Sequence, residues 1–264
     1  MLVRSALLAS LSLAPISLPP MPRAASTTKY HFDLKTETTV DLSVVGAPTQ
    51  ITNLGLSAWV AMTLTDSAGG RVVHVVVDSL KVDTTIPQIT SATTDSAKGG
   101  VVHGFVDPSG HIKNVTATPA GNLILVAVQG VVNALFPRVK AGTKAGDHWV
   151  DTTEVSNAGE GNNTKVKLIL NYSADASENV AGIAATKVSA TSTSTVTGTM
   201  ENPMAGTMEV EGNGTGTGTF YIGADSRFLG GMLSSTIDQR LKVAMAPSPI
   251  PVKTVQSLTV TLIK

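Results

Sequence analysis

Apolar and polar residues alternate along much of this chain, and this period of two constrains the fold more than any other feature. Tyr30, Phe32 and Leu34 share one face of an extended segment, while the residues between them face the other way. The same alternation returns at 165–172 and 255–262. Thr and Val are abundant, and β-branched side chains fit a pleated sheet better than a helix. The pattern predicts a mainly β protein.

Further strands are expected wherever such alternation runs between turn signals. Glycine-rich turns at 68–70, 98–100, 108–110 and 230–231 separate them, and connections this short favour antiparallel neighbours. A weak echo between 105–112 and 220–229 indicates two related halves of about 80 residues each. The additional strands are expected at 38–45, 56–65, 71–83, 100–107, 110–118, 180–189, 191–200, 207–222 and 236–246.

One segment, 122–136, departs from this pattern and predicts a helix. Asn122 is a suitable N-cap, and Pro137 is a suitable stop. The segment is apolar nearly all round, so the helix should be buried on most sides, and a charge at Val128 or Val132 should cripple folding. The alternative is a strand pair or a mobile apolar loop, which Gly130 and the valines favour. The residues at helical spacing are Leu125, Val128, Val132, Leu135 and Phe136.

Residues 1–26 have the pattern of a secretory signal peptide. Arg4 precedes an uncharged run over 5–18, and prolines lead to the small residues 24–26. The run is shorter than the roughly 20 residues that a membrane span needs. The alternative is an uncleaved N-terminal anchor. We expect a single β-rich domain over 27–264, a periplasmic or secreted location, and no stable membrane span after cleavage.

Charge and composition exclude several classes of protein. The chain has 19 basic and 19 acidic residues, so it lacks the excess of positive charge that a nucleic-acid partner requires. It has no Cys, which excludes disulfides, thiol nucleophiles and Cys-based metal sites. No sequence feature indicates a cofactor, and the oligomeric state is left open.

The histidines provide the only candidate ligands for a transition metal. His74 and His103 lie in the middle of predicted strands, and each is followed four residues later by an acid, Asp78 or Asp107. Residues four apart in a strand share a face, so a His/Asp cluster across two strands is conceivable. Scattered surface histidines are far commoner, and we therefore expect no metal site.

Catalytic patterns are lacking as well. The acid pairs Asp78/Asp83 and Asp147/Asp151 lie in polar, loop-like sequence, where solvated turn residues are the simpler interpretation. No Gly-x-Ser-x-Gly motif occurs. The glycines at 212–218 are followed by neither the Lys nor the helix of a phosphate loop. We predict no catalytic residues and no enzymatic activity.

Residues 189–218 form a stretch rich in Thr, Ser and Gly. Gly212, Gly214, Gly216 and Gly218 alternate with polar residues, which leaves one face of a strand bare. Such a face suits a tight sheet bend, or close approach of a ligand or another backbone. A flexible surface hairpin is the equal alternative.

A family resemblance enters at Leu135-Phe136-Pro137 and at the segment 146–152, Gly-Asp-His-Trp-Val-Asp-Thr. Together with the signal peptide and the two strand-rich halves, the arrangement is similar to the periplasmic lipoprotein-carrier and mycobacterial lipid-binding lipoprotein group. The resemblance implies a strongly curved antiparallel sheet, a half-barrel of two related halves, around one buried apolar helix. The group binds acyl chains on the apolar concave face of its sheet.

The function implied by this resemblance is non-catalytic binding of a hydrophobic small molecule or lipid in the half-barrel trough. The alternative is a structural or envelope-interaction module with a filled core and no ligand, and an exported hydrolase has the least support. The ligand-lining candidates, which are also core candidates, are Val128, Val132, Leu135, Phe136, Trp59, Phe105 and Trp149.

Overall fold

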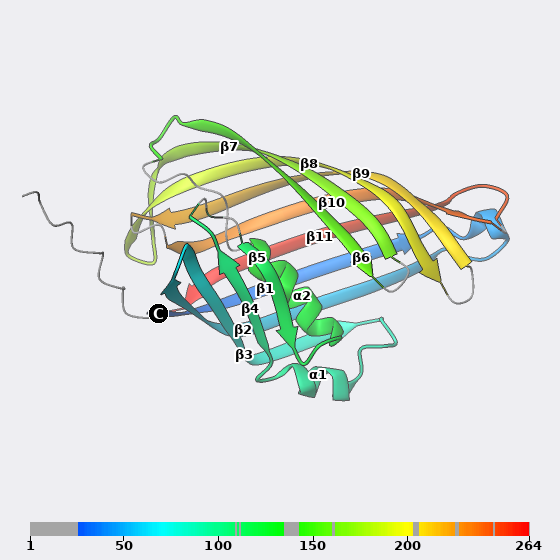
Figure 1. The fold of residues 1–264 in the computed structure, drawn as a ribbon, viewed down its shortest axis with the longest axis horizontal. Coiled ribbons are helices and arrows are strands. Elements are labelled where there is room, and N and C mark those ends of the chain that lie inside the picture. Colours follow the sequence, from blue (N-terminus) through cyan, green and yellow to red (C-terminus); the bar gives the residue numbers. More distant parts are fainter. Residues whose placement is uncertain are drawn as a thin grey trace, which may run out of the picture.

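Eleven antiparallel strands in the described residues form one continuous sheet (Figure 1). The computed structural model describes residues 26–108, 110, 112–134, 143–159, 162–202, 206–224, 227–244 and 246–263. The strand order is β5-β4-β3-β2-β1-β11-β10-β9-β8-β7-β6. Strands that follow one another in sequence therefore lie side by side, except β5 and β6, which form the two edges, and β1 meets β11 at the centre.

The strands are long, as expected for a chain rich in β-branched residues. The first group is β1 (Ser26–Val40), β2 (Gln50–Ser67), β3 (Gly70–Thr84), β4 (Val101–Val106) and β5 (Ile112–Thr118). The second group is β6 (His148–Gly159), β7 (Asn162–Val180), β8 (Ile183–Asn202), β9 (Gly206–Gly223), β10 (Phe228–Val243) and β11 (Ile250–Ile263).

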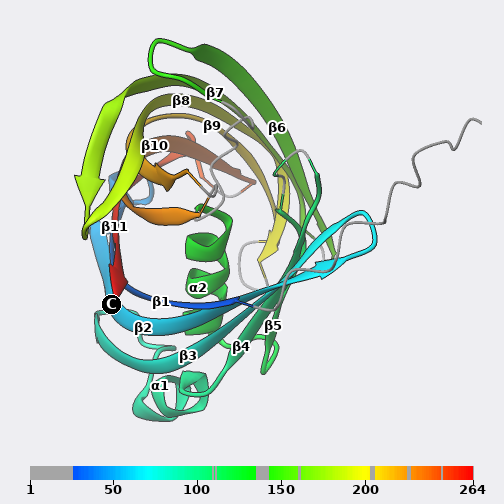
Figure 2. The same ribbon diagram turned by 90° about the vertical axis from the view of Figure 1, so that its left-hand side faces the viewer.

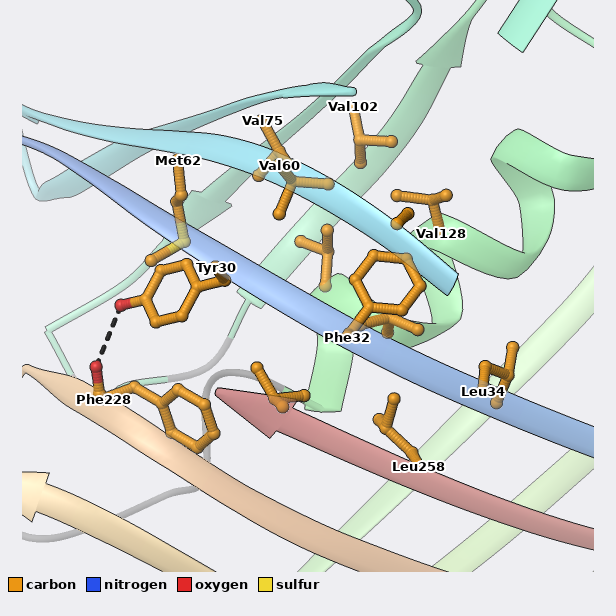
Figure 3. Close-up of a cluster of buried hydrophobic side chains, with 14 of the residues drawn as sticks. Tyr30, Phe32, Leu34, Val60, Met62, Val75, Val102, Val128, Phe228 and Leu258 are labelled. Atoms are coloured by element: carbon orange, nitrogen blue, oxygen red, sulfur yellow. Dashed lines mark hydrogen bonds between the residues drawn. The ribbon is translucent and has the colours of Figure 1, made fainter. Parts of the chain in front are cut away.

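The sheet has an inner face, which carries the core, and an outer face. Tyr30, Phe32 and Leu34 of β1 are buried on the inner face, as their spacing predicted. Leu258 of β11 lies directly opposite Leu34 and joins the same core. Figure 2 shows the sheet curving around the side on which helix α2 (Leu123–Ala134) lies, and Figure 3 shows Val128 of this helix close to Phe32.

Helix α2 begins at the cap that its sequence predicted. The side-chain oxygen of Asn122 accepts hydrogen bonds from the backbone N–H groups of Ile124 (2.9 Å) and Leu125 (3.1 Å). The amide nitrogen of Asn122 donates to the carbonyl oxygen of Thr93 and to Ser96, both in helix α1 (Ser91–Ala97). Asn122 thus ties the two helices together, and the strand-pair and loop alternatives for this segment are excluded.

The half-barrel around one buried helix is wrong as a description of the fold. The strands form one sheet of eleven rather than two related halves, because β1 and β11 pair along twelve residues at its centre. Helix α2 packs mainly against β4, β5 and α1, at one end of the sheet. It is not buried on most sides, since Leu123 is 43% exposed and Val126 is 52% exposed.

Several predicted boundaries also differ. The predicted strand 38–45 ends at Val40, and a short 3-10 helix, η1 (Ser43–Val45), follows it. The predicted strand 180–189 instead spans a turn at 181–182, where Ala181 and Gly182 have positive φ, and 191–200 belongs to the same strand as 183–189. Strand β6 and helix α1 were not predicted. Helix α1 is only seven residues long, so its hydrophobic period is too short to read.

Candidate functional site

Two hollows in the structure are candidates for a functional site. The first is a cavity of about 420 Å³ between α2 and the inner face. Its walls come from the exposed side of the helix, including Leu123 and Val126, and from core residues such as Phe220 and Leu258. Hydroxyl and amide groups of Thr36, Ser192, Ser235 and Gln256 also reach it.

The ligand-lining residues predicted from sequence do not line this cavity. Val128, Val132 and Trp149 are buried in the core, where Trp149 stacks on Tyr172 at 5.1 Å between ring centroids. Trp59 and Phe105 lie on the outer face instead, because each alternates with buried neighbours on its strand. Leu135 and Phe136 lie outside the described residues. The structure does not gather the described five into one site.

The second hollow is a groove of about 950 Å³ on the outer face, across β8, β9, β10, β11 and the end of β1. Two rows of side chains cross the strands in register and line it. The first row is Thr197, Glu211, Arg240 and Pro251. The second row is Thr39, Lys253, Asp238, Asn213 and Thr195. We call this surface the outer groove.

Opposite charges face each other across the strands in the outer groove. Glu211 of β9 is paired in register with Arg240 of β10, and Asp238 of β10 with Lys253 of β11. Among the described residues, none of the ion pairs within 4.0 Å involves these four groups. All four charges are therefore available to a solute.

A neighbouring pair of the same kind behaves differently. Glu209 and Lys242 are also opposite each other on β9 and β10, and they form an ion pair at 3.3 Å. They lie outside the lining of the outer groove. The contrast shows that register alone does not close an ion pair on this sheet.

The alternating glycines of β9 lie behind the outer groove, and their role is close packing within the sheet. A Cβ built on Gly214 would lie 2.5 Å from the Ser194 hydroxyl oxygen, and one built on Gly216 would lie 2.6 Å from that of Ser192. Both contacts are shorter than real Cβ atoms make. The glycines therefore allow β8, β9 and β10 to pack closely, and the described part of this stretch forms paired strands within the sheet.

Sequence reasoning did not find the outer groove. The strands 207–222 and 236–246 were expected, so the exposed face of each was available from the alternation. The pairing partners were not expected, because the alternation along one strand does not fix its register against the next strand. A search for opposite charges at matched positions of successive strands would have found Glu211 with Arg240.

Hydrogen bonding perturbs one titratable group at the rim of the outer groove. Hydrogen bonds from Ser43, first from its side chain and then from its backbone N–H, lower the pKa of Asp41 at the rim of the outer groove. The side-chain hydrogen bond and the charge of Glu178 raise the pKa of Lys187, away from both hollows. In the described part of the chain, no cluster of three or more His, Asp or Glu is arranged to hold a metal ion. No helix among the described residues is long and apolar enough to cross a membrane.

Comparisons with known proteins give no family. No family model matches the chain, and no curated protein matches it. Similar solved structures include a triple mutant of Rhodopseudomonas blastica porin, at 10% identity and a TM-score of 0.25, covering 89% of this chain and 99% of the porin. They also include OccK2 (OpdF) of Pseudomonas aeruginosa in complex with glucuronate, at 7% identity and a TM-score of 0.25, covering 90% of this chain and 98% of OccK2.

The resemblance to the lipoprotein-carrier group is wrong, because the described strands form one continuous sheet of eleven in which β1 pairs with β11, and not a half-barrel of two related halves. The predicted hydrophobic ligand or lipid partner and the ligand-free structural module both rested on that half-barrel and are wrong with it. The prediction of a periplasmic or secreted protein without a membrane span depended on the same resemblance and is withdrawn with it. A similarity this low, with a TM-score of 0.25, does not identify the function of this chain.

Proposed function

We propose that this protein binds a small zwitterionic solute in the outer groove and catalyses no reaction on it. The observation that carries the proposal is an arrangement of two acidic and two basic side chains on three adjacent strands, Glu211, Arg240, Asp238 and Lys253. All four belong to the described residues, and they form no ion pair with one another. A solute bearing both an ammonium and a carboxylate group would meet a charge of opposite sign for each. Hydrogen bonds to charged groups contribute about 1.5–3 kcal/mol.

The spacing of the four charges suits a solute the size of an amino acid or a dipeptide. Arg240 and Asp238 are two residues apart on one strand, which places their Cα atoms roughly 7 Å apart on the same face. Threonine hydroxyls on both sides of the charges, those of Thr195, Thr197, Thr215 and Thr236, can donate or accept further hydrogen bonds. The groove is open to solvent, so binding is expected to be reversible and fast.

A non-catalytic role agrees with the chemistry of the lining. Neither the Asp238 nor the Glu211 carboxyl is buried, and the outer groove contains no His, Tyr or Ser among its lining residues. The groove therefore offers fixed charges and hydroxyl groups that suit ionic and hydrogen-bonded recognition of a solute.

Titration of the full chain with small zwitterions, followed by NMR, tests the proposal. Amino acids and dipeptides should shift backbone signals of β9–β11 saturably, whereas neutral sugars should not. Asp238→Asn and Lys253→Gln should each weaken binding by about tenfold or more, which corresponds to losing roughly 1.4 kcal/mol. The matched controls Glu209→Gln and Lys242→Gln remove the neighbouring exposed ion pair and should leave binding unchanged.

Two outcomes would contradict the proposal. One is the absence of saturable shifts at the outer groove with any of the zwitterions. The other is an equal loss of binding in the groove variants and in the two controls. Recovery of a chemically altered solute after prolonged incubation would contradict the non-catalytic part alone.

A further inference from the structure

Two histidines face each other on the outer face of the sheet. They lie on β3 and β4, toward the β5 edge and away from the outer groove. His74 of β3 and His103 of β4 are paired directly in register. Their Nδ1 atoms are 3.3 Å apart, and their rings meet edge to face, with centroids 4.7 Å apart and an angle of 68° between the planes. Both side chains reach solvent.

The two acids that sequence analysis placed beside these histidines point elsewhere. Asp78 lies at a β-bulge and is 3.8 Å from the Lys29 ammonium, while Asp107 is 2.7 Å from the Lys113 ammonium. In register, the neighbours of the pair are Thr63 and Thr116. The His/Asp cluster therefore does not form, and two converging imidazoles remain.

The separation of the two nitrogens matches that of two imidazole ligands on one tetrahedral zinc ion. Zinc–nitrogen bonds of about 2.0–2.1 Å at the tetrahedral angle place the two nitrogens roughly 3.3–3.4 Å apart. We propose that His74 and His103 bind one Zn²⁺ ion together through their Nδ1 atoms. Water fills the remaining positions, since no third His, Asp or Glu joins the pair within the described ranges.

Without metal, the two rings are joined by a hydrogen bond, and zinc binding would replace that bond. At an Nδ1–Nδ1 distance of 3.3 Å, this hydrogen bond requires one Nδ1 to carry a proton and donate the bond, while the other Nδ1 accepts it. In the metal-bound form both Nδ1 atoms present lone pairs, so the ring that donated holds its proton at Nε2 instead. This is a change of tautomer, and the neutral pair loses no proton overall. Since β3 and β4 fix the pair in register, binding requires little reordering of the backbone.

Calorimetric titration of the full chain with Zn²⁺ alone tests this site. We expect His74→Gln and His103→Gln each to weaken zinc binding by about tenfold or more, and the double variant to be no weaker than either single one, because chelation needs both rings. His31→Gln and His148→Gln are the matched controls. The ring of His31 lies 4.5 Å from that of Trp59 between centroids, and His148 begins β6, so neither lies at the pair.

A second measurement uses the unaltered protein, so it does not depend on the folding of any variant. On adding Zn²⁺, the side-chain Nδ1 signals of His74 and His103 should shift together in a nitrogen-15 NMR spectrum. The proposal is overturned if the shifts appear at other histidines, or if the two pair variants bind zinc as tightly as His148→Gln does. A hydrogen-bonded pair with no affinity for metal gives no shift at all, and that result overturns it too.

Discussion

The hydroxyl of Tyr30 donates a hydrogen bond of 2.9 Å to the backbone carbonyl oxygen of Phe228, a residue 198 positions further along the chain (Figure 3). The two rings are 6.1 Å apart between centroids. Tyr30 is fully buried, and Phe228 starts β10, so this bond reaches past β11, the strand that lies between them. It joins the two flanks of the sheet beside the central pairing of β1 with β11.

Replacing Tyr30 by Phe should lower the free energy of unfolding by about 1–3 kcal/mol, because the buried Phe228 carbonyl loses a partner while the ring packing is kept. Urea denaturation followed by circular dichroism measures the change. Tyr221→Phe is the matched control, since Tyr221 is on the outer face and only half-buried. An equal loss of stability in the two variants would show that the buried hydrogen bond of Tyr30 contributes no more than the half-buried hydroxyl of Tyr221.

The same substitution at two glycines should have opposite effects. Gly214→Ala places a methyl group 2.5 Å from the Ser194 hydroxyl and 3.0 Å from the Thr236 carbonyl oxygen, so it should destabilise the sheet by about 1–3 kcal/mol. Gly130→Ala meets nothing within 4 Å in the middle of α2, and should stabilise the protein by about 1 kcal/mol, because Ala favours a helix. Thermal melts of both variants check the sign. Stabilisation by Gly214→Ala would mean that β8 and β9 do not approach as closely as described.

Lysine scanning of α2 separates its two sides. Val128→Lys places an unpaired charge at a fully buried position, and should cost more than about 3 kcal/mol or prevent folding. Val126→Lys, at a position that is 52% exposed, should change stability by no more than about 0.5 kcal/mol. Soluble yield and denaturant midpoints give the comparison. If Val128→Lys were tolerated as well as Val126→Lys, the packing of α2 against the sheet would be disproved.

Asp41 should make a small contribution to stability that depends on pH. Its hydrogen bonds from Ser43 hold its pKa below the ordinary value of 3.8. The contribution is therefore complete above the unfolded pKa, and it is lost as the pH falls through the lower, folded value. Asp41→Asn should reduce the melting temperature slightly at neutral pH, and the difference from the original protein should vanish at strongly acidic pH. A difference that grew on acidification would contradict this assignment.

Local patterns predicted the strand content well, because alternation depends only on which face each residue occupies. Tyr30, Phe32 and Leu34 are buried as expected, and Asn122 caps the only helix that was predicted. What the sequence could not provide was the order of strands. Lys35 of β1 pairs with Ser257 of β11, which is far away in the sequence. The local alternation of residues contains no information about such a pairing.

The candidate site was missed for the same reason. Trp59 and Phe105 were chosen as lining residues because they are large and apolar, yet both lie on the outer face. An aromatic side chain that is half-buried beside another side chain, as Trp59 is beside His31, gives the same local signal as one in the core. The facing charges of the outer groove, and the facing histidines, become visible only once the register of neighbouring strands is known.

Because β11 supplies the partner for one edge of β1, that edge stays unpaired in the nascent chain until β11 has been synthesised, although β2 already covers the other edge. Contacts of such long range slow folding, and a bare strand edge invites association with other chains. A circular permutant that begins at β6 and joins β11 to β1 through a linker would place these two strands next to each other in synthesis. Such a permutant should refold faster and aggregate less than the original sequence, without losing the arrangement of the sheet.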